Sequence, residues 1–373
     1  MNIAEITTYK EGGAYTHVIE LVKGFKSNAL IVTGNTKKSG FEEENNLLYY
    51  HVPLLKSMWE VFFVNHPGAY KELEKVLFEK KIDLIHFHSP LFTFLHGFLK
   101  KNNFPTILTV HYLLNIKSND VSAAMYKSFI KSISRYLGKN VEKIICVNED
   151  YIPVFKKWGI DSEKLVYIPN GVDTNKFSPG KSKINKKLKD SKLIIYFGRL
   201  HYQKNVELLI HAFKLIKKQH NSVKLIIIGT GNHYDKLKKL TQDDSDIIMT
   251  GFISDEKLVD FLRAADIVVF PSRGENASLT IMEAMACSLP VVSSEVGNAG
   301  KILKDGRGIL LKEYTKQEIA DICLNIINNE ELAKKIGKKA RDYVVKNHCW
   351  LNISKETEKL YEKVVKDWNK KII

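Results

Sequence analysis

Cysteine is scarce in this sequence, with four residues in a chain of 373. The four are widely scattered, and no two of them form a C-x-x-C pair: Cys146, Cys287, Cys323 and Cys349. This spacing excludes a disulfide-stapled scaffold and the paired cysteines of a zinc ribbon. We therefore expect buried, apolar thiols in a reducing compartment.

Long hydrophobic runs are also lacking. No apolar stretch approaches the roughly 20 residues that a membrane-spanning helix needs. The first residues, from Met1 to Glu5, contain no basic segment and turn acidic at once, so we do not expect a secretory signal. The sequence predicts a cytoplasmic protein, and peripheral contact with the inner face of an anionic membrane stays open.

Acidic residues are outnumbered, with 42 Asp and Glu against 57 Lys and Arg, which gives a net charge of +15. Such an excess favours anionic partners, namely nucleotide diphosphates, nucleic acid or an acidic membrane surface. It is equally compatible with lysines spread over solvated faces. Because the basic residues are dispersed without interleaved aromatic residues, we do not expect nucleic-acid binding.

Short apolar runs alternate with amphipathic helical stretches along the chain. Continuously apolar strands are typical of parallel sheets that are covered on both faces. The β-then-α rhythm occurs twice, which predicts an α/β protein of two doubly wound, Rossmann-like domains. The expected strands are 3–7, 29–33, 84–88, 106–111 and 143–148 in the first domain, and 192–198, 224–229, 247–252, 266–271 and 291–294 in the second.

We expect the domain boundary at Asn170-Gly171, so that the domains cover residues 1–170 and 171–353. The polar stretch 178–189 just beyond it is typical of an exposed linker. Ligands of open parallel sheets bind outside the carboxyl ends of the strands. Two such edges that face each other would form an interdomain cleft, where we expect the site.

The most informative segment runs from Phe270 to Val292, where an apolar strand is followed by an apolar helix. Glu283 is the only charged residue between Leu279 and Pro290. A carboxylate on such a helix should have little access to solvent and should need a hydrogen-bonding or charged partner. The helix N-terminus near Ser278 presents N–H groups and a positive dipole end, which suit a phosphate.

This segment resembles the signature of the family 4 (retaining) glycosyltransferases of GT-B fold, known as glycosyl transferases group 1. The family pattern has two glutamates separated by seven residues, Glu275 and Glu283 here. Other motifs agree with the family in order along nearly the whole chain: Gly12-Gly13, His111, Asn170-Gly171, Gly198-Arg199, Lys204-Asn205, Gly229-Thr230-Gly231 and Pro290-Val291-Val292.

The resemblance implies retaining sugar transfer from a nucleotide-diphosphate sugar to a hydroxyl acceptor, which would be a glycan, a lipid-linked molecule or a small molecule. A UDP- or GDP-sugar is the expected donor. No metal or other cofactor is expected, because protein cations would meet the diphosphate. The first domain would bind the acceptor and the second the donor, and the last helix, over residues 354–373, would cross back onto the first domain.

Arg199 and Lys204 follow the expected strand 192–198, and Gly198 permits a tight exit from it. An arginine fork and a lysine point charge can flank a diphosphate. By resemblance these two residues act in catalysis. The alternative interpretation is two surface bases among the chain's many.

The glycine pair Gly12-Gly13 follows the first expected strand, and glycine lets backbone N–H groups approach a phosphate closely. The resemblance places this loop, together with Gly198 and Gly231, against the donor. Gly229-Thr230-Gly231 also follows a strand as a dinucleotide fingerprint would, but Tyr234 replaces the third glycine, so the pattern does not indicate NAD.

By resemblance, Glu283 binds the donor ribose and Glu275 contacts the donor sugar. The residues between them that line the donor are Asn276, Ala277, Ser278 and Leu279. The family commonly reads Glu-Gly-Phe-Gly at positions 275–278, so this chain departs from it, although Ser278 is a competent helix N-cap.

Histidines mark the ends of two strands. Relatives use a histidine at the position of His111 to touch the transferred sugar or acceptor; a structural histidine is the alternative. His86 and His88 share one face of a strand, but no nearby carboxylate or third ligand is evident in the sequence. We therefore interpret them as structural and expect no metal there.

Other features point to alternative functions. Asp244-Ser245-Asp246 mimics a metal-binding D-x-D motif but is expected to be a solvated turn. Lys127, Lys131 and Arg135 recur every four residues, so they share a helix face that could rest on anionic lipid or simply be solvated.

Two other functions stay open, a nucleotide-sugar epimerase of related fold and a catalytically degenerate binding subunit.

Overall fold

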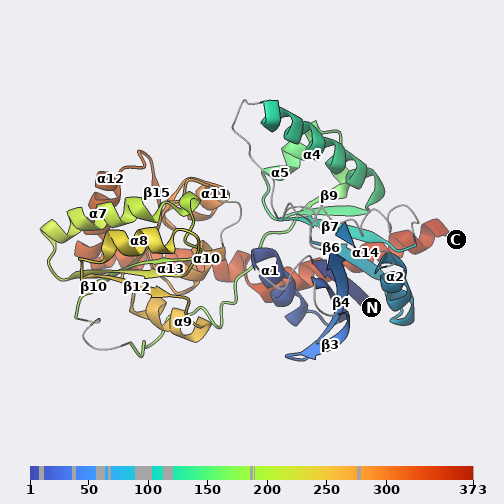
Figure 1. Cartoon of the computed structure of the whole chain (residues 1–373), viewed down its shortest axis with the longest axis horizontal. Helices are drawn as coiled ribbons and strands as arrows, with labels where there is room; N and C mark the ends of the chain where they lie inside the picture. The colour runs from blue at the N-terminus through green and yellow to red at the C-terminus, as the bar shows by residue number, and fades with distance from the viewer. Residues whose placement is uncertain are drawn as a thin grey trace. The chain divides into compact units, whose positions relative to one another are not determined.

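The computed structural model describes residues 1–7, 12–35, 39–55, 64–65, 69–88, 103–111, 121–184, 188, 190–274 and 279–372. Within these residues the chain divides into two compact units. Unit 1 comprises Met1–Asn170 and Trp350–Ile373, and unit 2 comprises Gly171–Cys349. Both units are α/β (Figure 1).

The sheet of unit 1 has the strand order β3-β4-β2-β1-β6-β7-β8-β9, with β5 paired to β4. Neighbouring strands are parallel except that β3 and β5 run antiparallel to β4. An antiparallel edge on a mostly parallel sheet is common in doubly wound folds. The strands are β1 (Asn2–Thr7), β2 (Asn28–Asn35), β3 (Gly40–Glu44), β4 (Leu47–Leu55), β5 (Val64–Asn65), β6 (Leu84–Phe87), β7 (Thr106–Val110), β8 (Lys143–Cys146) and β9 (Leu165–Tyr167).

The helices of unit 1 connect these strands, and one helix arrives from the far end of the sequence. The helices are α1 (Gly12–Lys23), α2 (Ala69–Glu79), α4 (Val121–Asn140), α5 (Tyr151–Lys157), η1 (Ser162–Lys164) and α14 (Trp350–Ile372). α14 packs against α1, as Figure 1 shows in red beside blue. The hydroxyl of Ser354 donates to the carbonyl of Leu21 at 2.8 Å, and the Glu358 carboxylate accepts from the backbone N–H groups of Lys26 and Ser27. The expected return of the last helix is confirmed.

The sheet of unit 2 is parallel throughout the described strands and has the order β12-β11-β10-β13-β14-β15. Its central strands are buried on both faces, which explains their continuously apolar sequences. The strands are β10 (Lys192–Phe197), β11 (Val223–Ile228), β12 (Ile247–Gly251), β13 (Ile267–Phe270), β14 (Val291–Ser294) and β15 (Ile309–Leu311).

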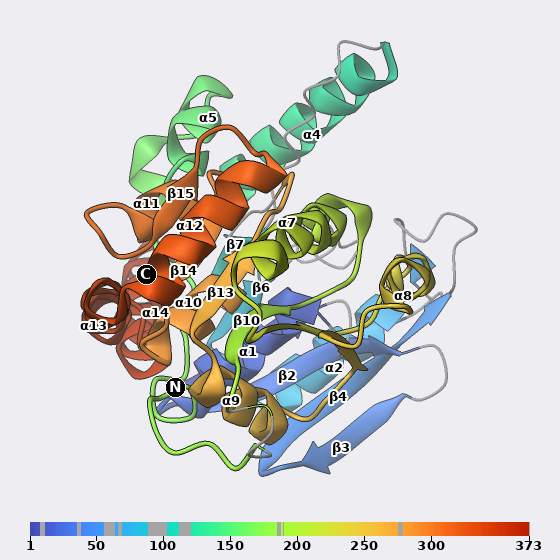
Figure 2. The ribbon, with the colours of Figure 1, turned by 90° about the vertical axis from the view of Figure 1, so that its left-hand side faces the viewer.

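Helices cover this second sheet on both sides, because right-handed crossovers that run in opposite directions place their helices on opposite faces. Figure 2 shows α7 and α12 side by side, and these two helices pack together. α10 packs instead against α13 and β14. The helices are η2 (Tyr202–Lys204), α7 (Val206–Gln219), α8 (Tyr234–Thr241), α9 (Asp255–Ala264), α10 (Leu279–Ala286), α11 (Ala299–Leu303), α12 (Lys316–Asn328) and α13 (Glu330–Asn347).

The prediction of two doubly wound α/β units is confirmed. Residues 179–181 and 183 of the expected linker are exposed, as predicted, but the segment also makes hydrogen bonds to unit 2. In the stretch after Phe177, the Ser182 hydroxyl donates to the carbonyl of Asp260 at 2.8 Å. Arg263 donates to the carbonyl of Ser178 at 2.9 Å. Asp260 and Arg263 both lie on α9, so the chain around Ser178 and Ser182 is hydrogen-bonded to a helix of unit 2.

Candidate active site

The strand order of unit 2 reverses between β10 and β13, since β11 and β12 lie on one side and β14 and β15 on the other. In open parallel sheets, the carboxyl ends of the strands at such a reversal form the usual ligand site. The loop that follows β10 carries Gly198, Arg199 and Lys204, and the chain that follows β13 leads into α10. The fold therefore brings two of the predicted donor-binding segments to the same edge.

Glycines let the chain leave this edge in tight turns. A Cβ atom on Gly229 would lie 2.0 Å from the carbonyl oxygen of Gly198, and one on Gly231 would lie 2.2 Å from that of Leu200. Gly198, Gly229 and Gly231 also have φ values of 137°, 132° and 153°, which side chains disfavour. The Gly229-Thr230-Gly231 motif thus has a structural reason, the close passage of the chains that leave β10 and β11.

The two predicted cations, Arg199 and Lys204, lie in the loop after Gly198. Arg199 is exposed, and its carbonyl accepts a hydrogen bond of 3.0 Å from the Tyr196 hydroxyl. Lys204 is half-buried at the end of η2. The backbone N–H of Arg273, beyond β13, donates to the carbonyl of Gln203 at 2.7 Å. This bond joins the two loops and brings the backbone of a third basic residue to the same edge.

The predicted donor residues at the start of α10 are only partly described. Glu275, Asn276, Ala277 and Ser278 lie outside the described residues, whereas Leu279 is the first residue of α10 and is half-buried. Glu283 is also half-buried, although the residues around it on α10 are fully buried. Glu283 is therefore more accessible than its neighbours on α10, and its need for a polar partner stays a prediction.

In unit 1, Gly12 and Gly13 open α1 after β1. A Cβ atom on Gly13 would meet nothing within 4 Å. The packing of the described residues therefore leaves open space beside this helix start.

The strand order of unit 1 also reverses, between β1 and β6, because β2 lies beyond β1 and β7 lies beyond β6. Here the fold gathers what we call the histidine cluster: Glu5, His17, His86, His88 and His111. Glu5 lies on β1, His86 on β6 and His17 on α1, while His88 and His111 directly follow β6 and β7.

Hydrogen bonds link the cluster through His88. The Nε2 atom of His88 lies 2.6 Å from Oε2 of Glu5, and its Nδ1 atom lies 3.1 Å from Nε2 of His111. The Nδ1 atom of His17 lies 2.9 Å from Oδ1 of Asn170. All of these residues are buried except His111, which is half-buried.

The prediction that His86 and His88 have no nearby carboxylate or third ligand is wrong. Glu5 contacts both histidines, and His111 and His17 lie beside His88. Glu5 and His111 lie on or directly after neighbouring parallel strands and His17 lies on α1, all far from His86 and His88 in the sequence, so local spacing could not reveal them. One available signal was Glu5, a carboxylate within an otherwise apolar strand.

His86 and Tyr361 complete the polar network. The two ring nitrogens of His86 contact the hydroxyl groups of Tyr361 and Thr109 at 2.5 and 2.7 Å. The Tyr361 hydroxyl donates to Oε1 of Glu5 at 2.8 Å. Tyr361 belongs to α14, so the C-terminal helix supplies part of this network.

Burial sets the charges in the cluster. It lowers the pKa of His17 to about 3 and that of His88 to about 4, and it holds the pKa of His111 well below its usual value. Burial alone would raise the pKa of Glu5, but interactions with His86 and His88 outweigh it and lower that pKa. At neutral pH these three histidines are therefore uncharged and Glu5 is ionised.

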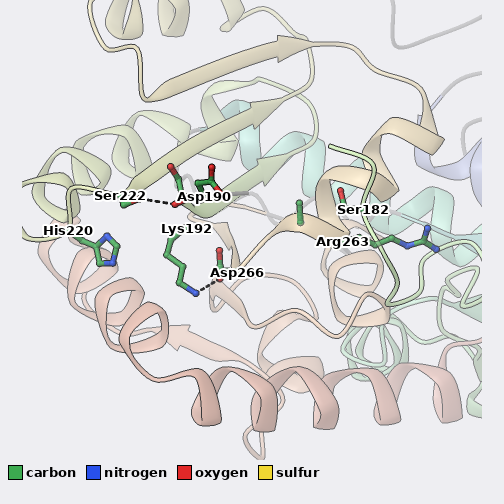
Figure 3. Close-up of a pocket in the computed structure, with 9 residues that line it drawn as sticks. Ser182, Asp190, Lys192, His220, Ser222, Arg263 and Asp266 are labelled. Atoms are coloured by element: carbon green, nitrogen blue, oxygen red, sulfur yellow. Dashed lines mark hydrogen bonds and ion pairs between the residues drawn. The ribbon is translucent and has the colours of Figure 1, made fainter. Parts of the chain in front are cut away.

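A pocket in unit 2 lies away from the predicted donor site. Figure 3 shows Lys192, Ser222 and Asp266 in its wall, at the amino ends of β10, β11 and β13. Lys192 and Asp266 form an ion pair at 2.9 Å across it. Because these polar groups satisfy each other at the opposite edge of the sheet, we assign no catalytic role to this pocket.

The D-x-D motif at residues 244–246 and the basic helix face at residues 127–135 each contain a side chain with a structural role. Asp246 forms ion pairs of 2.5 and 2.6 Å with Lys217 and Lys224, so it is not a freely solvated turn residue. Arg135 on α4 donates to the carbonyl of Trp158 at the end of α5. The side chain of Lys127 lies outside the described residues.

Two family models match the chain. The model described as Glycosyltransferase Family 4 matches residues 11–176, and the model described as Glycosyl transferases group 1 matches residues 178–343. An uncharacterized glycosyltransferase of Methanocaldococcus jannaschii is 29% identical over 360 residues, which cover 95% of each chain. A subunit of the phosphatidylinositol N-acetylglucosaminyltransferase of Saccharomyces cerevisiae is 23% identical, over 88% of this chain and 75% of that protein.

Solved structures share the fold. Sucrose-phosphate synthase from Thermosynechococcus elongatus matches with a TM-score of 0.79 at 18% identity, over 97% of this chain and 98% of the other. Anabaena HepE in complex with UDP matches with a TM-score of 0.77 at 18% identity, over 97% and 100%. The chain is therefore an enzyme of the GT-B glycosyltransferase class. Within that class it belongs to glycosyltransferase family 4, group 1.

The structure describes no helix that is both long enough and apolar enough to cross a membrane.

Proposed function

We propose that the chain transfers a sugar, with retention at the anomeric carbon, from a nucleotide-diphosphate sugar to a hydroxyl acceptor. The observation that carries this proposal is the placement of Arg199 and Lys204 at the strand reversal of unit 2, where parallel sheets bind their ligands. In this proposal unit 2 binds the donor and unit 1 binds the acceptor.

In the proposed reaction, the bond between the anomeric carbon and the phosphate oxygen breaks while the sugar takes on oxocarbenium character. The electron pair leaves with the diphosphate, and Arg199, Lys204 and the N-terminus of α10 stabilise its growing charge. The acceptor oxygen bonds to the anomeric carbon on the face that the diphosphate leaves, and the departing phosphate oxygen accepts the proton of the acceptor hydroxyl. The diphosphate is then neutralised by protein cations, and we propose that this step needs no metal ion.

Other residues take the roles that the family resemblance implies. Glu283 hydrogen-bonds the ribose, and Glu275 and His111 contact the transferred sugar or the acceptor. Segment 276–279 and the glycines at positions 12, 13, 198 and 231 give the donor close access to backbone N–H groups. The half-buried state of Glu283 and the open space at Gly13 support these assignments.

For the donor, we propose a UDP- or GDP-sugar. Supporting evidence comes from HepE, whose solved structures hold UDP and UDP-glucose. For the acceptor, we propose a glycan or lipid-linked hydroxyl at an anionic membrane surface. The net charge of +15 and the name of the yeast relative, which specifies phosphatidylinositol, support this choice.

Thermal unfolding with UDP, GDP or ADP tests the donor assignment, because a ligand that binds only the folded state raises its apparent stability. We expect UDP or GDP to raise the Tm, and Arg199→Ala to reduce that rise. Lys218→Ala is the matched control, since it removes an exposed cation from the last turn of α7, toward the opposite edge of the sheet. An unchanged nucleotide effect in Arg199→Ala would contradict the proposed donor site.

A further inference from the structure

The histidine cluster fills the position in unit 1 that a ligand occupies in many parallel sheets. His88 follows β6 and His111 follows β7, at and beside the reversal of strand order, and His17 enters from α1. One ligand atom from each of these histidines lies within 4.8 Å of the others. The sugar-transfer proposal uses only His111 and leaves the convergence of the other two unexplained.

The spacing of the nitrogens matches a metal site. Nδ1 of His88 and Nε2 of His111 are 3.1 Å apart. Two imidazole nitrogens that bind one tetrahedral zinc ion at about 2.0–2.1 Å are separated by roughly 3.3 Å. The two rings are therefore already placed almost as zinc would hold them.

The hydrogen-bond partners of His88 and His17 determine which ring nitrogen of each histidine keeps its lone pair. A histidine that binds a metal through one nitrogen usually donates the N–H of the other to a carboxylate or a carbonyl group. Oε2 of Glu5 lies 2.6 Å from Nε2 of His88, and Oδ1 of Asn170 lies 2.9 Å from Nδ1 of His17. With those nitrogens protonated, the lone pairs remain on Nδ1 of His88 and Nε2 of His17.

His86 is excluded as a ligand by its own contacts. Both of its ring nitrogens are engaged, one by Tyr361 and one by Thr109. Glu5 likewise contacts His88 and Tyr361. Glu5 is thus an outer partner, and its negative charge offsets part of the charge of a cation beside it.

We propose that His17, His88 and His111 form a binding site for a divalent transition metal of the zinc class. Three neutral imidazoles suit zinc, while magnesium and calcium prefer oxygen ligands. The half-buried His111 provides the entry side, and three protein ligands leave a fourth coordination position open. The low pKa values of the three histidines keep them neutral, as metal ligands must be. The site shares His111 with the proposed sugar transfer, so a bound metal would compete with the contact of this residue to sugar or acceptor, but metal binding is tested without any substrate.

The test titrates the chelator-treated, tag-free chain with zinc by calorimetry and with cobalt(II) by visible absorption. We expect one metal ion per chain, with the intense visible bands of tetrahedral cobalt. Glu5→Gln should weaken binding by about 10- to 100-fold, because it removes an outer partner of a ligand. His111→Ala should weaken binding further, since it removes a ligand from a half-buried position.

The control variant is His233→Ala. His233 and His201 lie near each other in unit 2, with ring centroids 6.2 Å apart, and are the natural place for adventitious zinc. Equal binding in wild type and His111→Ala, or loss of binding only in His233→Ala, would overturn the proposal. So would a wild-type chain that binds neither metal, because the cluster would then be a hydrogen-bond network in which His111 donates to His88. If His111→Ala fails to fold, the ¹⁵N shifts of the wild-type histidines with and without zinc decide the same question.

Discussion

At the scale of single residues, the two sheets use their carboxyl ends in different ways. The edge of unit 2 presents an exposed arginine and a half-buried lysine on glycine-rich turns. The edge of unit 1 holds two buried, uncharged imidazoles, His17 and His88, near the ionised carboxylate of Glu5. The first arrangement suits an anion, and the second suits a cation or a neutral polar group.

Arg199→Ala and Lys204→Ala are each expected to lower kcat by about 100-fold or more, because each removes a group that stabilises the departing diphosphate. The measurement is the release of nucleotide diphosphate in the presence of donor and acceptor, with Lys218→Ala as the control. Wild-type turnover in both variants would remove these residues from the mechanism.

The buried histidines predict how stability depends on pH in chelator-treated protein. Since the pKa values of His17 and His88 are lowered on folding, the unfolded chain binds more protons below its own histidine pKa of about 6.5. Stability is therefore complete above that pH and falls as the pH drops toward the folded values of about 3 and about 4. We expect a loss of about 2 kcal/mol for each histidine between about pH 7 and pH 5.

Denaturant unfolding across this range measures that slope, and the lowered pKa of Glu5 adds a loss in the same direction at still lower pH. His88→Gln should flatten the slope. A stability that stays constant or rises from pH 7 to pH 5 would mean that the cluster accepts protons in the folded state.

At the scale of elements, the fold depends on how α14 docks on unit 1. The Glu358 carboxylate accepts from the backbone N–H groups of Lys26 and Ser27 at distances of 2.9–3.1 Å. Glu358 is buried, whereas Glu362, one turn later on the same helix, is exposed. The two glutamates therefore form a natural pair of test and control.

Glu358→Ala is expected to destabilise the chain by about 1–3 kcal/mol, because it leaves two backbone donors without their charged partner. Glu362→Ala should change stability by less than about 0.5 kcal/mol. Urea unfolding of both variants measures the difference, and equal midpoints would show that the docking of α14 does not depend on this carboxylate.

Much of the element pattern could be predicted from the sequence, because β10, β11 and β13 are predominantly apolar runs and the apolar core of β1 is interrupted only by Glu5. The hairpin of β3 and β4 was not predicted. Its strands carry Glu42 and His51, which bond to each other across the pair. The turn signal was Asn45-Asn46, both with positive φ values of 52° and 61°, as a tight hairpin turn requires.

The candidate site was predictable only where its parts lie close together in the sequence. Gly198, Arg199 and Lys204 follow one strand, and the family resemblance identifies them. The histidine cluster joins α1 with residues on or directly after three different strands. The parallel register of β1 and β6 pairs Glu5 with His86, and the docking of α14 adds Tyr361. A sequence pattern does not encode such a register directly.

At the scale of the whole molecule, the net charge of +15 is the feature with the broadest effect. If the acceptor lies at an anionic membrane, vesicles that contain acidic lipid should retain the chain while neutral vesicles do not. Retention should fall steeply between about 0.05 and 0.5 M salt, as the Debye length shortens to a few ångströms. Cosedimentation measures this, and salt-insensitive or absent retention would argue for an acceptor in solution.

The return of α14 has a consequence for biosynthesis. Unit 2 is one uninterrupted segment, Gly171–Cys349, whereas unit 1 needs residues from both ends of the chain. Domains usually fold in the order in which the ribosome releases them, but here unit 1 stays incomplete until the residues of α14 have been synthesised. A released chain that ends before Trp350 should therefore already protect unit 2 from protease, while residues 1–170 remain open to cleavage.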